Sequence, residues 1–140
     1  MKPYLCIDFD GVIHSYTSGW KGEDVIPDPP VDNVFKWLNE AQEFFTLVIY
    51  SSRSKSDAGR NAMERWFCEW AKKELGETHQ FSQGGIKSPI VFAHEKPAAF
   101  LTIDDRAICF KGNWDALDPK ELLQFKPWNA KKLISKEVEK

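Results

Sequence analysis

The sequence predicts an α/β fold with a mainly parallel sheet. Short apolar runs of strand length alternate with longer amphipathic segments in the order strand, helix, strand, helix, strand, strand. The 140 residues fit one core, so a single domain is expected over 1–140. Polar residues cluster directly after the apolar runs, where parallel sheets bind their ligands. Together these features predict a three-layer, Rossmann-like architecture with helices on both faces of the sheet.

Four elements are expected in the first part of the chain: a strand over 4–9, a loop over 14–30, a helix from about Pro30 to Phe45, and a strand over 45–50. The first run lacks helical periodicity and ends in Asp10-Gly11, which favours a strand followed by a turn. The loop is rich in proline and glycine. The helix has a 3.6-residue apolar period, a proline in its first turn and Asp28 as its expected N-cap. The second strand is apolar almost throughout, as in parallel strands covered on both faces.

The second part is expected to hold a helix over 57–75, a loop over 76–88, strands over 89–93, 99–103 and 107–110, a segment over 119–125 and a charged C-terminal helix. The long helix has a buried-type apolar stripe, with Ser54 or Ser56 as its N-cap and Gly76 as its stop. Among the three strands, "AFLTI" at 99–103 has the strongest pattern, because its residues are mostly apolar and β-branched or aromatic.

Composition excludes several classes of protein. The formal net charge is −2, so no global field attracts the chain to a polyanion or an acidic membrane. No apolar run is long enough to span a bilayer, and the N-terminus lacks a signal-peptide pattern. Three widely spaced cysteines fit neither a disulfide framework nor a zinc site. We therefore expect a soluble cytoplasmic protein without a membrane partner.

Carboxylates follow two of the predicted strands. Asp8 and Asp10 end the first, and Asp104 and Asp105 follow "FLTI". The carboxyl ends of parallel strands meet at one edge, so these groups are expected to share a site. A cluster rich in oxygen and poor in thiol and imidazole suits Mg²⁺, which commonly binds substrate phosphates. An Asp-Gly pair is also ordinary turn chemistry, and this alternative applies to Asp10 taken by itself.

Phosphate-binding groups are expected beside these acids. Gly11 allows a turn that brings backbone N–H groups close to an anion. Ser51 directly follows the second strand and can donate a hydrogen bond, with Ser52 as its competitor. Lys96 lies one strand before the acidic pair and supplies a positive charge, with Lys87 as its competitor.

Four segments resemble the motifs of the haloacid dehalogenase (HAD) superfamily. They are "DFDGV" at 8–12, the serine at 51 that closes an apolar run, the lysine at 96 in "KP", and "IDD" at 103–105. The resemblance implies a HAD-like fold. Short insertions after the first and second motifs imply a member without a cap domain.

The resemblance also implies roles for individual residues. Asp8 would be the nucleophile that forms an aspartyl phosphate, and Asp10 the general acid and then the general base. Ser51 and Lys96 would bind the transferring phosphoryl group. The ligands implied for Mg²⁺ are the Asp8 carboxylate, the Asp10 backbone carbonyl, Asp104, and Asp105 either directly or through water.

The expected activity is that of a phosphatase, a phosphoric monoester hydrolase whose substrate is unidentified. "YSSRSKS" and "IDDRA" are similar to the 3′-phosphatase domain of phage polynucleotide kinase-phosphatases, so a nucleic-acid 3′ end is one alternative substrate. The candidate substrate contacts are Gly11, Ser52, Arg53 and Arg106. The same residues would also suit a phosphotransferase, or a regulatory domain that binds phosphate and metal without hydrolysis.

Two further residues of the 14–30 loop, His14 and Trp20, have no clear role in the sequence. His14 has no metal-ligand spacing and is expected near the entrance of the site, because it follows the acidic motif. Trp20 is expected either to cover the substrate or to anchor the loop.

Overall fold

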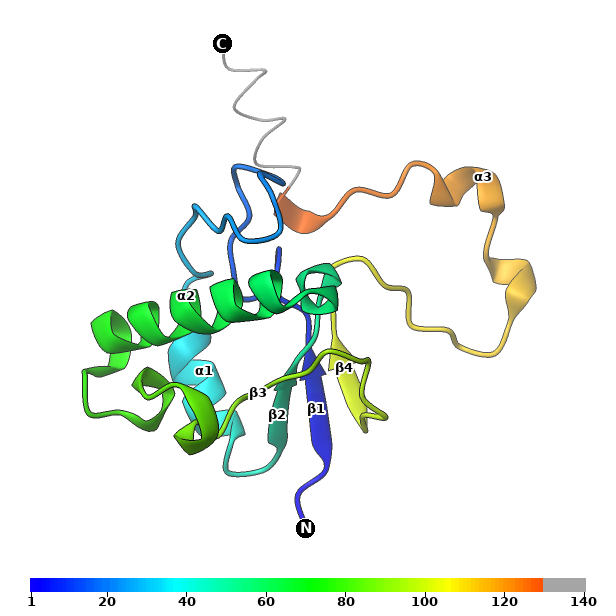
Figure 1. Ribbon diagram of the computed structural model, residues 1–140. Helices are drawn as coiled ribbons and strands as arrows, with labels where there is room; N and C mark the ends of the chain where they lie inside the picture. The colour runs from blue at the N-terminus through cyan, green and yellow to red at the C-terminus, as the bar shows by residue number, and fades with distance from the viewer. Residues whose placement is uncertain (130–140) are drawn as a thin grey trace.

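A computed structural model describes residues 1–129 and contains a four-stranded sheet in the order β3-β2-β1-β4 (Figure 1). All three strand pairs are parallel, so the predicted α/β fold with a parallel sheet is confirmed. The strands are β1 (Tyr4–Ile7), β2 (Thr46–Ile49), β3 (Val91–Phe92) and β4 (Leu101–Ile103).

The two long helices pack on one face of this sheet. They are α1 (Val34–Ala41) and α2 (Asp57–Leu75), and a third, α3 (Pro119–Leu122), has a single turn. Alternate strand residues, including Leu5 and Leu47, join side chains of α1 and α2 in one buried cluster. Cys6 and Val48 are buried on the other face, outside that cluster. The predicted layer of helices is therefore seen on one face in the described residues.

Helix α2 has the predicted bounds. Ser56 caps it, since its side chain accepts a hydrogen bond from the Gly59 N–H, and the helix ends before Gly76 at a φ of 98°. Short 3₁₀ turns surround it: η1 (Ser52–Lys55), η2 (Gln80–Ser82) and η3 (Gly85–Lys87).

Helix α1 is shorter than predicted, and the cap predicted for it was wrong. The helix begins at Val34 with Asn33 as its N-cap, and Asp28 lies well before it. The physical reason is that the preceding residues pair with the segment after β1: the Val31 N–H donates to the Ile13 carbonyl at 2.8 Å. Those residues therefore cannot begin a helix.

The predicted strand over 107–110 is wrong, since these residues form an exposed coil after β4. Figure 1 shows the chain leaving β4 and looping away from the sheet through η4 (Trp114–Ala116) and α3 before it returns. On its return, Trp128 Nε1 donates to the Gly11 carbonyl. The predicted C-terminal helix lies outside the described residues. Within residues 1–129, no helix has both the length and the apolar character needed to cross a membrane.

Candidate functional site

Three carboxylates meet at the carboxyl ends of β1 and β4. Asp8 directly follows β1, and its N–H donates to the Ile103 carbonyl at 2.9 Å, which fixes it beside the end of β4. Asp104 and Asp105 directly follow β4. Each of Asp8, Asp104 and Asp105 contributes one carboxylate oxygen, and these three oxygens lie within 4.8 Å of one another. The parallel pairing of two neighbouring strands thus places three negative groups around one point.

Asp8 and Asp105 disfavour ionisation in the absence of a cation. Burial, followed by the nearby charges of Asp104 and Asp105, raises the pKa of Asp8 from 3.8 to about 8. Burial, with a smaller contribution from the charge of Asp104, also raises the pKa of Asp105. One oxygen of Asp105, Oδ1, is buried and has no hydrogen-bond partner within residues 1–129. A bound cation would satisfy this oxygen and offset the repulsion.

Gly11 allows the close approach of two loops at this site. It has a φ of +80°, which side chains rarely adopt, and its N–H donates to the His14 carbonyl at 2.8 Å. A Cβ atom at this position would lie 2.3 Å from Oδ2 of Asp105. A glycine is therefore required here for steric as well as conformational reasons.

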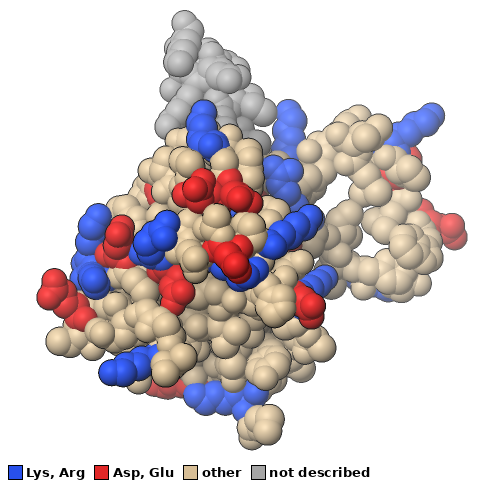
Figure 2. All heavy atoms as spheres, viewed as in Figure 1, with Lys and Arg blue, Asp and Glu red and all other residues tan. Residues whose placement is uncertain are grey.

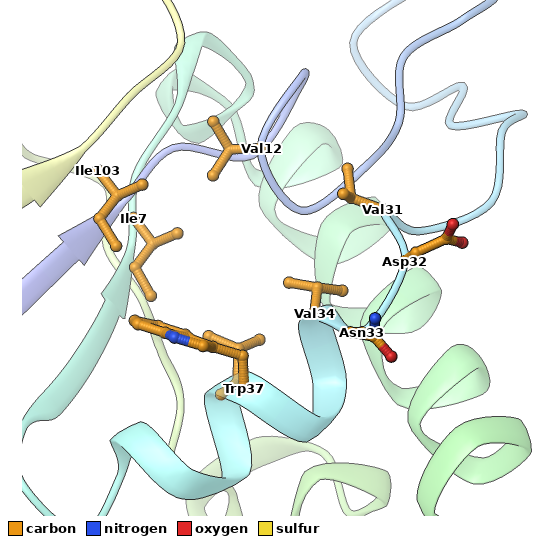
Figure 3. A pocket seen from close by; sticks show the side chains of 9 residues that line it. Ile7, Val12, Val31, Asp32, Asn33, Val34, Trp37 and Ile103 are labelled. Atoms are coloured by element: carbon orange, nitrogen blue, oxygen red, sulfur yellow. The ribbon is translucent and has the colours of Figure 1, made fainter.

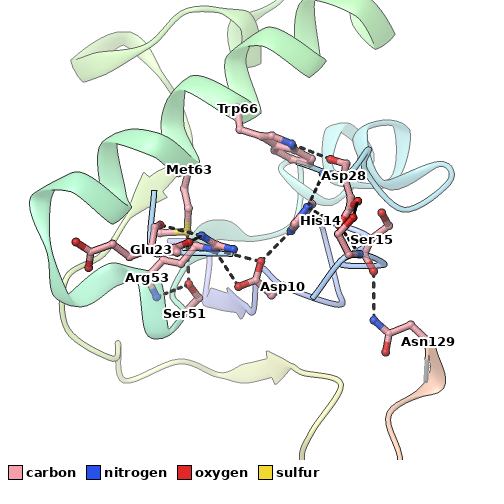
Figure 4. A network of polar contacts seen from close by, with 12 residues as sticks. Asp10, His14, Ser15, Glu23, Asp28, Ser51, Arg53, Met63, Trp66 and Asn129 are labelled. Carbon is pink, nitrogen blue, oxygen red and sulfur yellow. Dashed lines mark hydrogen bonds and ion pairs between the residues drawn. The ribbon is translucent and has the colours of Figure 1, made fainter. Parts of the chain in front are cut away.

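The Asp10 side chain belongs to a separate polar network (Figure 4). Its Oδ1 lies 2.9 Å from His14 Nδ1, and its Oδ2 accepts a hydrogen bond from Arg53 Nε at 2.9 Å. Among the described residues, the carboxylate oxygens that meet after β1 and β4 come from Asp8, Asp104 and Asp105, and not from Asp10. Asp8 and Asp10 therefore have different surroundings.

His14 is fully buried and fixes one side of Asp10. The Asp28 N–H donates to His14 Nε2 at 3.1 Å, so Nε2 is the acceptor and Nδ1 carries the proton that is donated to Asp10. The rings of Phe9 and Trp66 pack against the imidazole. The structure thus places His14 inside the network rather than at an entrance.

Asp28 anchors the loop that contains it. Its carboxylate accepts hydrogen bonds from the Ser18 N–H at 2.8 Å and the Ser18 hydroxyl at 2.5 Å. Burial acts to raise the pKa of Asp28, but these hydrogen bonds from Ser18 outweigh it, so the pKa is lowered. Its backbone carbonyl accepts from Trp66 Nε1 of α2 at 3.1 Å.

Arg53 is also fully buried, on the other side of Asp10. Its Nη1 donates to the carbonyls of Gly22 and Glu23, both at 2.8 Å, and its guanidinium lies 4.7 Å from the Trp20 ring centroid. Its Nη2 is buried without a hydrogen-bond partner among the described residues. Arg53 therefore connects Asp10 to the 14–30 loop, and the Trp20 ring of that loop packs on the Arg53 guanidinium.

The two groups predicted to bind phosphate are placed differently. Ser51 is buried, and its hydroxyl oxygen accepts from the Arg53 N–H at 3.0 Å and lies 3.5 Å from Met63 Sδ. Lys96 is exposed in the connection from β3 to β4, and its charge acts on Cys6, on the sheet face opposite the main helices. The structure does not bring Ser51 into contact with the three clustered carboxylates.

The two remaining predicted contacts, Ser52 and Arg106, are both exposed. Ser52 is exposed at the start of η1. Arg106 is exposed, and its backbone N–H donates to Asp104 Oδ1 at 2.9 Å, which closes the turn after β4. A hollow of about 270 Å³ adjoins these acids and is lined mainly by apolar groups, including Val12, Ile103 and Trp128.

Sequence reasoning missed the functional contacts of His14 and Asp28. The only local signal was a histidine four residues after Asp10, across a glycine turn. The partner that fixes its tautomer comes from 14 residues further along the chain. Local patterns do not encode this contact.

In comparisons with family models, curated proteins and solved structures, nothing matches this chain. Its likeness to the HAD motifs therefore stays a prediction from four short segments. A function for this chain must be inferred from the geometry around Asp8 and Asp10.

Proposed function

We propose that this protein is a Mg²⁺-dependent phosphohydrolase of the HAD type, without a cap domain, that acts through an aspartyl-phosphate intermediate. The convergence of Asp8, Asp104 and Asp105 at one edge of a parallel sheet carries this proposal. The separate fixation of Asp10, two residues from the nucleophile, supports it.

The donor atoms fit a hard cation. All three side chains offer oxygen, and Oδ1 of Asp105 is buried without a hydrogen-bond partner among the described residues. Mg²⁺ would be held by Asp8, Asp104 and Asp105, with the Asp10 backbone carbonyl as a further ligand. When bound, Mg²⁺ would neutralise part of the charge of the carboxylates and of a substrate phosphate.

The chain's own residues would then divide the reaction into two steps. An oxygen of ionised Asp8 attacks phosphorus, the bond to the leaving oxygen breaks, and protonated Asp10 gives its proton to that oxygen. In the second step Asp10 takes a proton from water as the water oxygen attacks phosphorus. The bond to Asp8 breaks, and inorganic phosphate leaves.

His14 and Arg53 would orient Asp10 during both proton transfers. The bond from His14 Nδ1 and the bonds from Arg53 Nε fix the carboxylate from two sides, which limits its rotation. Lys96 and backbone N–H groups near Gly11 are proposed to contact the phosphoryl oxygens.

The substrate is proposed only as a phosphate monoester. On the face shown in Figure 2, Lys and Arg side chains alternate with Asp and Glu and form no single-sign surface. This face therefore offers no broad track for a polynucleotide backbone. A nucleic-acid 3′ end stays a member of the test panel.

Hydrolysis of a phosphate panel with and without Mg²⁺ tests the proposal. The panel contains an aryl phosphate, nucleotides, sugar phosphates, pyrophosphate and 3′-phosphorylated oligonucleotides. We expect Mg²⁺-dependent release of phosphate, which Asp8→Asn abolishes without loss of folding, because an amide cannot act as the nucleophile. The matched control is Asp24→Asn, at an exposed position of the loop.

Three outcomes would contradict the proposal. Full activity of Asp8→Asn would reject the nucleophile assignment. Binding of beryllofluoride with Mg²⁺, but no turnover across the panel, would favour a non-hydrolysing phosphate-binding domain. Preferential transfer of phosphate to an added alcohol would indicate a phosphotransferase.

A further inference from the structure

A segment after β4 is separate from the rest of the molecule. This segment, residues 107–127, is named the arm. It follows the turn at Asp104 and ends where Trp128 Nε1 donates to the Gly11 carbonyl at 2.7 Å and Asn129 Nδ2 to the Ser15 carbonyl at 3.2 Å. Within the described chain, the arm's hydrogen bonds join its own residues. Both of its ends are thus fixed, and its middle projects away from the sheet (Figure 1).

The arm exposes apolar side chains to water. Trp114 is 75% exposed and Leu123 88%. The other large apolar side chains exposed on the arm are Ile108, Phe110, Leu122 and Phe125. Figure 2 shows the arm as a lobe that stands off from the body and is mostly uncharged. Two of these rings, Phe110 and Trp114, pack together with their centroids 4.7 Å apart, and exposed apolar groups gathered on one segment mark a site of interaction.

The body of the molecule has an open groove that is apolar, as the arm is. It has a volume of about 300 Å³ and lies between α1 and the β4 side of the sheet (Figure 3). Most of its lining is apolar, and Trp37, 46% exposed, forms one wall. β4 is an end strand of the sheet, and its Leu101 is 53% exposed. Among the described residues, no strand pairs with the outer edge of β4, and such an edge beside an apolar groove readily accepts a further chain segment.

We propose that the arm of a second copy of this chain covers this groove and the free edge of β4, and that the exchange is reciprocal. Both ends of the arm are fixed on its own body while its middle points away, so a second copy can receive it without a change in its path. A two-fold arrangement makes the same contact twice. The arm has three lysines and three acidic residues, a formal charge of zero, so two arms do not repel.

The available area is sufficient for a stable pair. Phe110 and Phe125 are 48% and 47% exposed, in addition to Trp114. Covering the exposed parts of these three rings in both arms, with the surface beneath them, would bury about 1,400 Å². Stable protein interfaces bury about 1,200–2,000 Å².

Sedimentation of the full chain over a range of concentrations tests the exchange. We expect a dimer whose dissociation constant rises about tenfold or more in Trp37→Glu, in the groove, and in Leu123→Glu, on the arm. The matched control, Ile86→Glu, changes a fully exposed residue outside both surfaces and should leave the dimer unchanged. Circular dichroism verifies that each variant is folded.

Mixing the two variants provides the decisive measurement. A mixture of Trp37→Glu and Leu123→Glu chains retains one intact arm-and-groove contact, so a mixed dimer should form where neither variant dimerises alone. A wild-type protein that is monomeric at every concentration would overturn the proposal. A dimer that resists both substitutions, or a mixture without mixed dimers, would also overturn it.

Discussion

Asp8 combines a buried position with two acidic neighbours, and this combination has a consequence for stability. A carboxyl group whose pKa is about 8 in the folded protein stays protonated after the unfolded chain, with a pKa near 3.8, has ionised. The unfolded state then binds fewer protons, so the free energy of unfolding falls as pH rises from about 4 to about 8. The cluster therefore destabilises the metal-free fold at neutral pH.

We predict that metal-free protein loses stability over this pH range, by on the order of a few kcal/mol, and that Asp8→Asn removes most of the loss. Urea unfolding at a series of pH values in the presence of a chelator measures the effect. Saturating Mg²⁺ should also flatten the dependence, because it favours the ionised carboxylates. An unchanged slope in Asp8→Asn would show that other groups cause it.

Gly11 is the second residue with a definite steric prediction. Gly11→Ala should weaken Mg²⁺ binding and lower the free energy of unfolding by about 1–3 kcal/mol, because its Cβ would displace Asp105 and its φ is positive. Gly19→Ala is the matched control, since Gly19 has a φ of +74° with nothing within 4 Å of the added Cβ. Calorimetric titration with Mg²⁺ compares the metal affinity of the two variants. An equal loss of affinity in both would contradict the steric argument.

At the scale of elements, α1 and α2 differ in how far local sequence determines them. The start and stop of α2 depend on Ser56 and Gly76, which act within one turn of the helix. The start of α1 depends on the bond from the Val31 N–H to the Ile13 carbonyl in the segment after β1, while Asp28 bonds to Ser18 and His14 and does not cap the helix. For this reason the sequence predicted the bounds of α2 and not those of α1.

The first turn of α2 is also where the helix touches the Asp10 network. A Cβ at Gly59 would lie 2.0 Å from the Arg53 carbonyl oxygen. A glycine-to-alanine change in a helix ordinarily stabilises it by up to about 1 kcal/mol. We predict that Gly59→Ala instead lowers the free energy of unfolding by about 1–3 kcal/mol, because the backbone before the helix must move.

Chemical denaturation measures this change, with Asn61→Ala as its control. Asn61 is exposed on the same helix, so its replacement reports helix propensity alone and should be neutral or stabilising. A gain in stability for Gly59→Ala would contradict the predicted steric conflict.

At the scale of the whole molecule, two irregular segments are held very differently. Despite its proline and glycine content, the 14–30 loop is hydrogen-bonded to the body: Arg53 donates to two of its carbonyls, and Trp66 donates to the carbonyl of Asp28. The arm is bonded at its ends. Composition alone does not distinguish the two cases, because both segments lack a regular apolar period.

We predict that Arg53→Lys increases amide hydrogen exchange in residues 15–30 by about tenfold. Lysine keeps the charge but cannot contact Asp10 and two carbonyls at once. Arg65→Lys, at an exposed position of α2, is the control and should leave this exchange unchanged. If exchange in 15–30 is equal in the two variants, Arg53 is not the anchor of the loop.

The sequence by itself determined the α/β class, the order of the elements and the strand ends at which acids occur. Periodicity and turn residues act locally, and the topology of parallel strands then brings Asp8, Asp104 and Asp105 to one edge. Only the tertiary structure decided that His14 and Arg53 hold Asp10, and that the arm stands apart from the sheet. The bond between Arg53 and Asp10 joins residues 43 positions apart, and a contact at that separation depends on how the elements pack, which no local pattern specifies.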